Sequence, residues 1–84
     1  MSESVVPMTL GDFLARRNFP LEAVAVLTDL DESTVSRIVN GHTRPLRVTI
    51  VRLAIGLGVG ARRMQAMCDA AWDAAHSQEE AVVR

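Results

Sequence analysis

The stretch "LEAVAVLTDLDESTVSRIVNG", residues 21–41, contains two short helical patterns with almost nothing between them. Apolar spacing predicts one helix over about 20–28 and a second over about 32–40. Only "TDLD" separates them, which is too short for anything but a tight turn. We expect Asp31 to cap the second helix with its carboxylate, and Gly41 to end it in a left-handed conformation. Two helices joined so tightly predict a helix-turn-helix.

Further helices are predicted on both sides of this pair. Thr9 and Asp12 have the spacing of a capping box, which starts a helix over about 9–17. Pro45 suits the start of a helix over about 46–57, where apolar residues recur at helical spacing.

The last predicted helix spans about 61–75, and its apolar stripe includes Met64, Met67 and Trp72. This stripe either closes the core of the domain or forms a symmetric dimer contact. No strand pattern and no internal repeat is present in the sequence.

A chain of 84 residues is long enough for one small domain with a modest core. A domain of this size buries about 60–65% of the surface that its unfolded chain exposes. The sequence therefore predicts an all-α, five-helix bundle over residues 9–76, with a flexible N-terminal arm at 1–8 and a flexible C-terminal tail at 77–84.

The charges are unevenly distributed along the chain, although the net charge is only −1. Residues 1–32 have a net charge of −4 and residues 69–84 a net charge of −3, whereas residues 33–68 contain six arginines and no acid. A basic middle between acidic ends is typical of a one-sided anion-binding surface. All nine basic residues are Arg, which suits phosphates and guanine edges, although the codon bias of a G+C-rich genome would explain the missing Lys equally well.

Other function classes have little support. The longest central apolar run, "LAIGLGVGA", has nine residues, against the roughly 20 of a membrane span, and no signal-peptide pattern is present. A single cysteine, Cys68, cannot form an internal disulfide and indicates a reducing, cytoplasmic location. His42 and His76 stand alone, so we expect no metal site, no cofactor and no catalytic group. Asp69 and Asp73 are interpreted as a solvated helix face.

Residues 21–41 resemble the helix-turn-helix of lambda-repressor-like proteins, the Cro/repressor or XRE family, and the likeness extends over about 9–75. It depends on the joint spacing of several residues and on no single one of them. They occupy the helix crossing, the turn, the inward positions of the recognition helix, a "G…P" pair and an ending similar to "LAxALGV": Ala25, Leu30, Val35, Ile38, Gly41, Pro45, Leu53, Ala54, Leu57 and Gly58.

Three positions depart from the family pattern. Asp29 stands at the turn, where the family usually has Gly; Asp tolerates the left-handed conformation better than most residues. Pro20 and Leu21 replace the usual capping and phosphate-binding residues, which puts one phosphate contact in doubt. The free N–H groups of the helix start could still serve that role.

The resemblance implies that the third helix enters the major groove of duplex DNA. The implied DNA-binding residues are Glu32, Ser33, Ser36, Arg37, Asn40, Thr43, Arg44 and Arg47. Arg37 can fork onto guanine, and the two serines are short enough to allow close approach. The residues from Asn40 onward lie where phosphate contacts are expected.

Each of these roles has a structural alternative. Arg37 could be plain solvated surface, and Glu32 either accepts from a cytosine amino group or stabilises the helix start. Arg52 is equally well explained by a surface salt bridge. Arg62 and Arg63 could touch DNA or a partner.

The resemblance therefore implies a sequence-specific, double-stranded DNA-binding transcriptional regulator, such as a small phage or mobile-element repressor that binds an inverted-repeat operator as a homodimer. With 84 residues we expect no ligand-sensing domain, so control would come from concentration, proteolysis or a partner. The alternative is a protein-binding helix-turn-helix module, such as an antitoxin that neutralises a partner protein. Its partner would bind the fifth helix or the tail, which contains Glu79, Glu80, Val82 and Val83. An enzyme is the least expected class.

Overall fold

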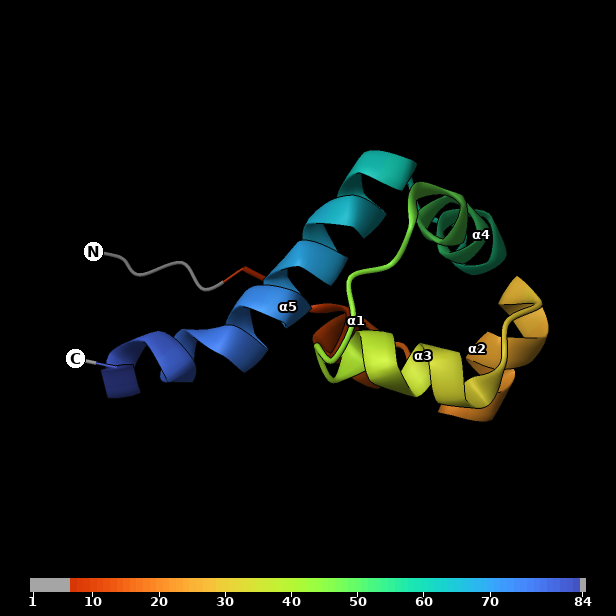
Figure 1. Ribbon diagram of the computed structural model, residues 1–84. Coiled ribbons are helices and arrows are strands. Elements are labelled where there is room, and N and C mark those ends of the chain that lie inside the picture. Colours follow the sequence, from red (N-terminus) through yellow and green to blue (C-terminus); the bar gives the residue numbers. More distant parts are fainter. Residues whose placement is uncertain (1–6, 84) are drawn as a thin grey trace.

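The structure is a computed structural model that describes the backbone of residues 7–83 and the side chains of residues 7–77. Five helices follow one another along the chain, and the described residues contain no strand (Figure 1). The helices are α1 (Leu10–Arg16), α2 (Leu21–Thr28), α3 (Glu32–Val39), α4 (Arg47–Leu57) and α5 (Ala61–Val83). The all-α, five-helix prediction is confirmed. The predicted arm at residues 1–8 lies almost wholly outside the described residues.

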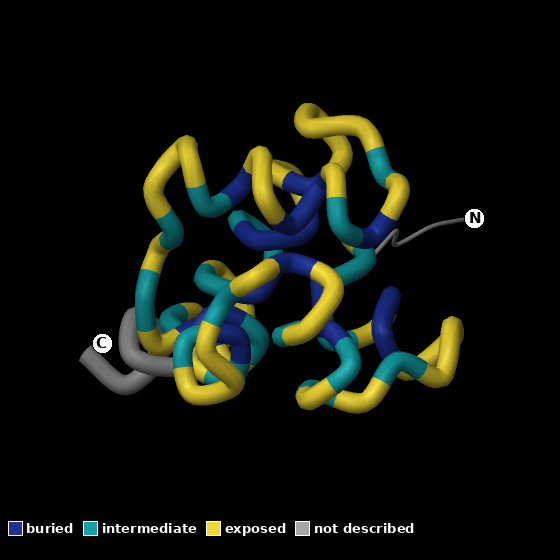
Figure 2. The backbone as a smooth tube through the Cα atoms, turned by 90° about the vertical axis from the view of Figure 1, so that its right-hand side faces the viewer, coloured by how far each residue is buried: buried dark blue, intermediate teal, exposed yellow. Residues whose placement is uncertain are grey.

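One apolar core joins all five helices, and the buried parts of the backbone face inward while the exposed parts lie outside (Figure 2). Met64 is 0% exposed and Met67 3%, so both side chains pack in this core. Burying an aliphatic side chain of this size stabilises the fold by about 1.5–3 kcal/mol. The core residues are Leu10, Phe13, Leu14, Val24, Val35, Ile38, Ile50, Leu53, Ala54, Leu57, Met64, Met67 and Cys68.

The first helix begins at the predicted capping box. The backbone N–H of Thr9 donates to Asp12 Oδ2 at 3.2 Å, and the N–H of Asp12 donates to Thr9 Oγ1 at 3.1 Å. Two N–H groups that α1 would otherwise leave without a partner are therefore satisfied. This prediction is confirmed.

The turn between α2 and α3 is as tight as predicted. Asp29 ends α2 with φ 60° and ψ 38°, the left-handed conformation that the family usually assigns to Gly. The N–H groups of Asp29 and Leu30 both donate to the carbonyl oxygen of Ala25. One residue in this conformation redirects the chain, so α3 begins only three residues later, at Glu32.

Gly41 ends α3 in the left-handed conformation, with φ 74°, as predicted. The N–H of Gly41 donates to Ile38 and the N–H of His42 donates to Arg37 at 2.8 Å, which is a Schellman motif. Gly41 also lies against α5, because a Cβ atom there would be 2.5 Å from the carbonyl oxygen of Ala71. The end of α3 is therefore fixed by a close approach that only glycine allows.

Three details of the prediction are wrong. Asp31 is the N-cap of α3, but its carboxylate makes no capping hydrogen bond, and only its backbone carbonyl accepts, from Val35. Pro45 does not start α4, because extended Leu46 is the N-cap and the helix begins at Arg47.

The third error concerns the length of the last helix. α5 continues to Val83, although the apolar stripe predicts an end near residue 75. The segment "HSQEEAVV" contains no Gly or Pro, so nothing in it breaks the helical backbone once the helix has started. The last turns of α5 extend away from the other helices (Figure 1).

Candidate nucleic-acid interface

The outward side of α3 is polar and its inward side is apolar. Val35 and Ile38 are buried in the core, whereas Glu32, Ser33 and Arg37 are exposed. Ser36 is half-buried, and Asn40 is exposed just after the helix. Residues spaced by three and four positions share one side of a helix, so the predicted contact residues of α3 form one outward stripe.

The start of α3 has no side-chain cap, since Asp31 makes no capping hydrogen bond. Among the described residues, Arg37 has no ion pair and no hydrogen bond from its guanidinium. An exposed guanidinium without an internal partner keeps all five of its donors for a ligand. As far as the described residues extend, the outward stripe therefore combines an unpaired cation with the positive end of a helix dipole.

Asn40 is less available than predicted. Its amide nitrogen donates to the carbonyl oxygen of Ser36 at 2.9 Å and lies 3.3 Å from Ser36 Oγ. The Asn40 amide is therefore bonded to the preceding turn of α3, where it also contacts the Ser36 hydroxyl. The Ser36 hydroxyl accepts in this contact, so its own proton remains available for an external acceptor, although the side chain is half-buried.

The loop after α3 is tied to α5 through Arg44. Its guanidinium forms an ion pair with Asp69, 3.4 Å between Nη2 and Oδ1, and lies 5.6 Å from the centre of the Trp72 ring. Thr43, beside it, is half-buried. An exposed ion pair of this kind is worth about 0.2–1 kcal/mol, so a phosphate could displace the Asp69 carboxylate. The interpretation of Asp69 as part of a solvated helix face is therefore wrong, since its carboxylate pairs with Arg44.

Trp72 is half-buried and stacks on His76, with 3.8 Å between the ring centroids. His76 also uses Nδ1 to contact the carbonyl oxygen of Trp72 at 2.8 Å. The Trp72–His76 spacing of one helical turn could have indicated this stack from the sequence. The Arg44–Asp69 pair could not, because 25 residues separate its members.

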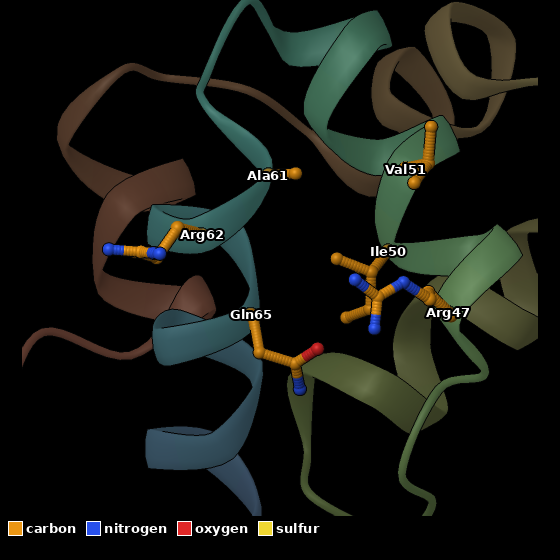
Figure 3. A pocket seen from close by; sticks show the side chains of 6 residues that line it. All are labelled: Arg47, Ile50, Val51, Ala61, Arg62 and Gln65. Atoms are coloured by element: carbon orange, nitrogen blue, oxygen red, sulfur yellow. The ribbon is translucent and has the colours of Figure 1, made fainter.

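Arg47 starts α4 and lines an open cleft of about 280 Å³ between α4 and α5. Arg47 and Gln65 point into this gap from opposite sides, while the Arg62 guanidinium points away from it (Figure 3). No acidic residue lines the cleft, so an anion there would meet no repulsion from its walls. The lining residues are Arg47, Ile50, Val51, Ala61, Arg62 and Gln65.

Arg52 belongs to the fold and not to this surface. Its Nη1 lies 3.5 Å from Asp29 Oδ2 and donates to the Asp29 carbonyl at 3.3 Å. The salt-bridge alternative for Arg52 is confirmed, and it holds α4 against the turn of the helix-turn-helix. Pro20 provides no side-chain cap to α2, and Leu21 packs against the core, so neither offers the family's usual phosphate contact.

Cys68 is buried in the core. Burial, with a smaller effect from the neighbouring Asp69 charge, raises the pKa of its thiol to about 12. The thiol therefore stays protonated near neutral pH and packs as a small apolar group. Within the part of the chain that the structure describes, no group of His, Cys, Asp and Glu could hold a metal ion, and no helix is long and apolar enough to cross a membrane.

The tight α2–α3 unit, the outward polar stripe on α3 and the flanking arginines define a helix-turn-helix DNA-binding domain. The comparison with known families agrees. Residues 12–63, more than half of the chain, match the family described as Helix-turn-helix (HTH_3). The chain belongs to this family, of the XRE or lambda-repressor-like class, and is a DNA-binding transcription regulator of that type. Searches of curated proteins and of solved structures each gave no match.

Proposed function

We propose that the protein is a small repressor of the phage or mobile-element type, which binds an inverted-repeat operator as a dimer through α3. The observation that supports this most directly is the outward stripe of α3, where Arg37 has no internal partner among the described residues. The protein acts by occupying DNA and not by catalysis. It works in the cytoplasm, where its single buried thiol, Cys68, stays reduced.

Base recognition is assigned to the first two turns of α3. Arg37 donates two hydrogen bonds to O6 and N7 of one guanine, a contact worth about 1–3 kcal/mol of discrimination. Ser33 and Ser36 allow the helix to approach the groove closely and donate to base or phosphate oxygens. Glu32 accepts from a cytosine amino group and weakens non-specific binding by repelling phosphates.

Phosphate contacts are assigned to the segment that follows α3. Thr43 and Arg44 lie in the loop, and Arg47 lies at the open cleft at the start of α4. Residues 33–68 contain six arginines and no acid, and the acids that pair with Arg44 and Arg52 lie outside this stretch. This excess of cations supports anion binding by this part of the chain, although the whole chain is slightly negative. Binding should weaken steeply with salt as counterions are released from DNA.

Dimerisation follows from the small size of the contact stripe. One short helix reads few base pairs, and two-fold dimers of such domains place their recognition helices about 34 Å apart. The domain measures 41 × 29 × 22 Å, so two domains in side-by-side contact have centres at a compatible separation. An inverted repeat is the DNA counterpart of that symmetry.

One observation favours a second candidate, a protein-binding module such as an antitoxin. α5 extends to Val83 and its last turns project from the bundle, which gives a partner protein a helix to bind (Figure 1). Removal of residues 77–84 separates the two functions. A DNA regulator keeps its DNA affinity after truncation, whereas an antitoxin loses its partner.

Selection of binding sites from a random duplex pool tests the proposed function. We expect one inverted repeat to be enriched, with affinity that falls steeply between 50 and 200 mM salt. If no sequence is enriched and binding stays weak at low salt, the fold serves protein contacts and the second candidate is favoured.

A further inference from the structure

The exposed large aliphatic side chains of the described residues gather on two neighbouring helices. All of them come from α2 or from α4 with its N-cap: Val26, Leu27, Leu46, Val48, Val51 and Ile55. Val26 is 82% exposed and Ile55 76%. Single exposed aliphatic residues are ordinary, but such a cluster on two neighbouring helices marks an interaction site.

Helix α4 carries apolar side chains on two opposite sides. Ile50, Leu53, Ala54 and Leu57 face the core, as expected for a helix on the surface of a bundle. The opposite side should then be polar, but Val48, Val51 and Ile55 recur there at spacings of three and four. A helix that is apolar on both sides is normally covered on both sides.

The two helices that carry these residues meet at the end of α2. α4 crosses the end of α2 closely, because a Cβ atom on Gly56 would lie 2.6 Å from the carbonyl oxygen of Leu27. The side chain of Arg52 reaches Asp29 at the end of α2. We call the surface made by Val26, Leu27, Asp29, Val51, Arg52 and Ile55 the α2–α4 face.

The charges of this face suit a second copy of the chain. Its two charged residues are Arg52 and Asp29, one of each sign, so the face is neutral. In a two-fold interface the same patch meets itself, and Arg52 of one protomer can approach Asp29 of the other. DNA does not suit the face, since its one arginine is balanced by one carboxylate and its remaining side chains offer no hydrogen-bond donor.

The alternative surface for a dimer contact is α5, but the apolar stripe of α5 already packs within its own domain. Met64 and Met67 are buried in the domain core, and Trp72 stacks on His76 beneath Arg44. The outward residues of α5 in the described part include Arg62, Gln65 and Asp73, which are polar.

We propose that the α2–α4 face binds a second copy of this chain and forms the two-fold interface of the operator-bound dimer. The inference rests on the proposed function, because it names the surface through which the proposed dimer forms. Aliphatic side chains from α2 and α4 pack at the centre of the interface, and the Arg52 and Asp29 side chains lie within it.

The test is Ile55→Glu, with Ala66→Glu as its matched control. Ile55 is exposed in the single protomer, so the glutamate should leave folding intact, which circular dichroism and thermal melting verify. In a two-fold interface the two glutamates would lie close together and desolvated. Ala66 is exposed on α5, so its glutamate adds the same charge outside the proposed face.

Sedimentation equilibrium gives the mass without DNA, and binding is measured on a single half-site duplex and on the selected inverted repeat. We expect Ile55→Glu to bind the half-site like the wild type but to lose at least tenfold in affinity for the inverted repeat, together with any dimer seen in free solution. Ala66→Glu should match the wild type throughout. The inference would be overturned if Ile55→Glu and the wild type had equal masses and bound the inverted repeat with equal cooperativity. It would also be overturned if only Ala66→Glu lost affinity for the repeat, or if the wild type neither dimerised nor bound the repeat cooperatively. Failure of the proposed function looks different, because then no duplex is bound selectively by any of the three proteins.

Discussion

The guanidinium of Arg44 lies 3.4 Å from the carboxylate of Asp69, so the loop that follows α3 is tied to the long α5. Asp69 also accepts a hydrogen bond from Gln65 Nε2 at 3.1 Å. The same arginine is one of the residues proposed to bind phosphate. Under this proposal the Asp69 carboxylate competes with DNA for the Arg44 guanidinium, and this competition can be measured.

Replacing Asp69 with Asn should tighten DNA binding by about 1.4- to fivefold, because an exposed ion pair of this kind is worth about 0.2–1 kcal/mol. Fluorescence anisotropy with a labelled operator measures the change. Asp73→Asn is the control, since it removes the same charge one turn further along α5 without contacting Arg44 in the described structure. An equal gain for both variants would show that general charge is responsible and not the Arg44 contact.

Gly41→Ala should destabilise the fold by about 2–5 kcal/mol. The left-handed conformation costs about 1–2 kcal/mol for a residue with a Cβ atom, and overpacking against α5 adds about 1–3 kcal/mol. Urea denaturation measures the free energy of unfolding. Gly58→Ala is a matched control, because Gly58 also has a positive φ, 71°, but its Cβ would meet nothing within 4 Å. Equal losses for the two variants would mean that the close approach of α3 to α5 is unimportant.

Thr9→Ala should cost about 1 kcal/mol of folding free energy, since it removes the side-chain half of the capping box at α1. Thr9→Ser keeps the hydroxyl oxygen that accepts from Asp12 and should retain most of the stability. Thermal melting of the three proteins measures this. A loss of the same size in Thr9→Ser would assign the effect to the methyl group and not to the cap.

The buried thiol of Cys68 should make the free energy of unfolding fall as the pH becomes alkaline. Its pKa in the folded protein, about 12, lies above the ordinary value of 9.0, so the unfolded chain loses this proton first. The stabilisation is complete below pH 9 and is lost progressively as the pH rises toward 12. Urea denaturation of the wild type and of Cys68→Ala over this range should show a steeper decline for the wild type. Parallel declines in both proteins would contradict the prediction.

Much of the fold could be predicted from local sequence signals. The capping box of Thr9, the left-handed Asp29 and the end of α3 at Gly41 each depend on neighbours within a few residues, and all three are confirmed. The extent of α5 was wrong because an apolar stripe marks where a helix is buried, and the backbone continues beyond the stripe until a residue breaks it. The predicted side-chain cap from Asp31 is wrong because a residue type suited to capping does not determine the rotamer of its side chain.

The candidate site was harder to predict than the fold. The outward position of Glu32, Ser33 and Arg37 follows from helical periodicity alone. The partners of Arg44 and Arg52 do not, because each ion pair joins segments more than twenty residues apart in sequence. Tertiary packing brings these groups together, and no local pattern encodes it.

The central claim is that α3 contacts bases through Arg37, and binding to variants of the selected operator tests it most directly. Each base pair of one half-site is substituted in turn, and affinities are measured for wild type, Arg37→Ala and Arg44→Ala. The account predicts that Arg37→Ala loses about 1–3 kcal/mol of discrimination at one base position and keeps the others. Arg44→Ala should instead weaken binding to all sites alike and reduce the salt dependence by about one counterion. If Arg37→Ala leaves every base preference intact, α3 does not recognise DNA as proposed.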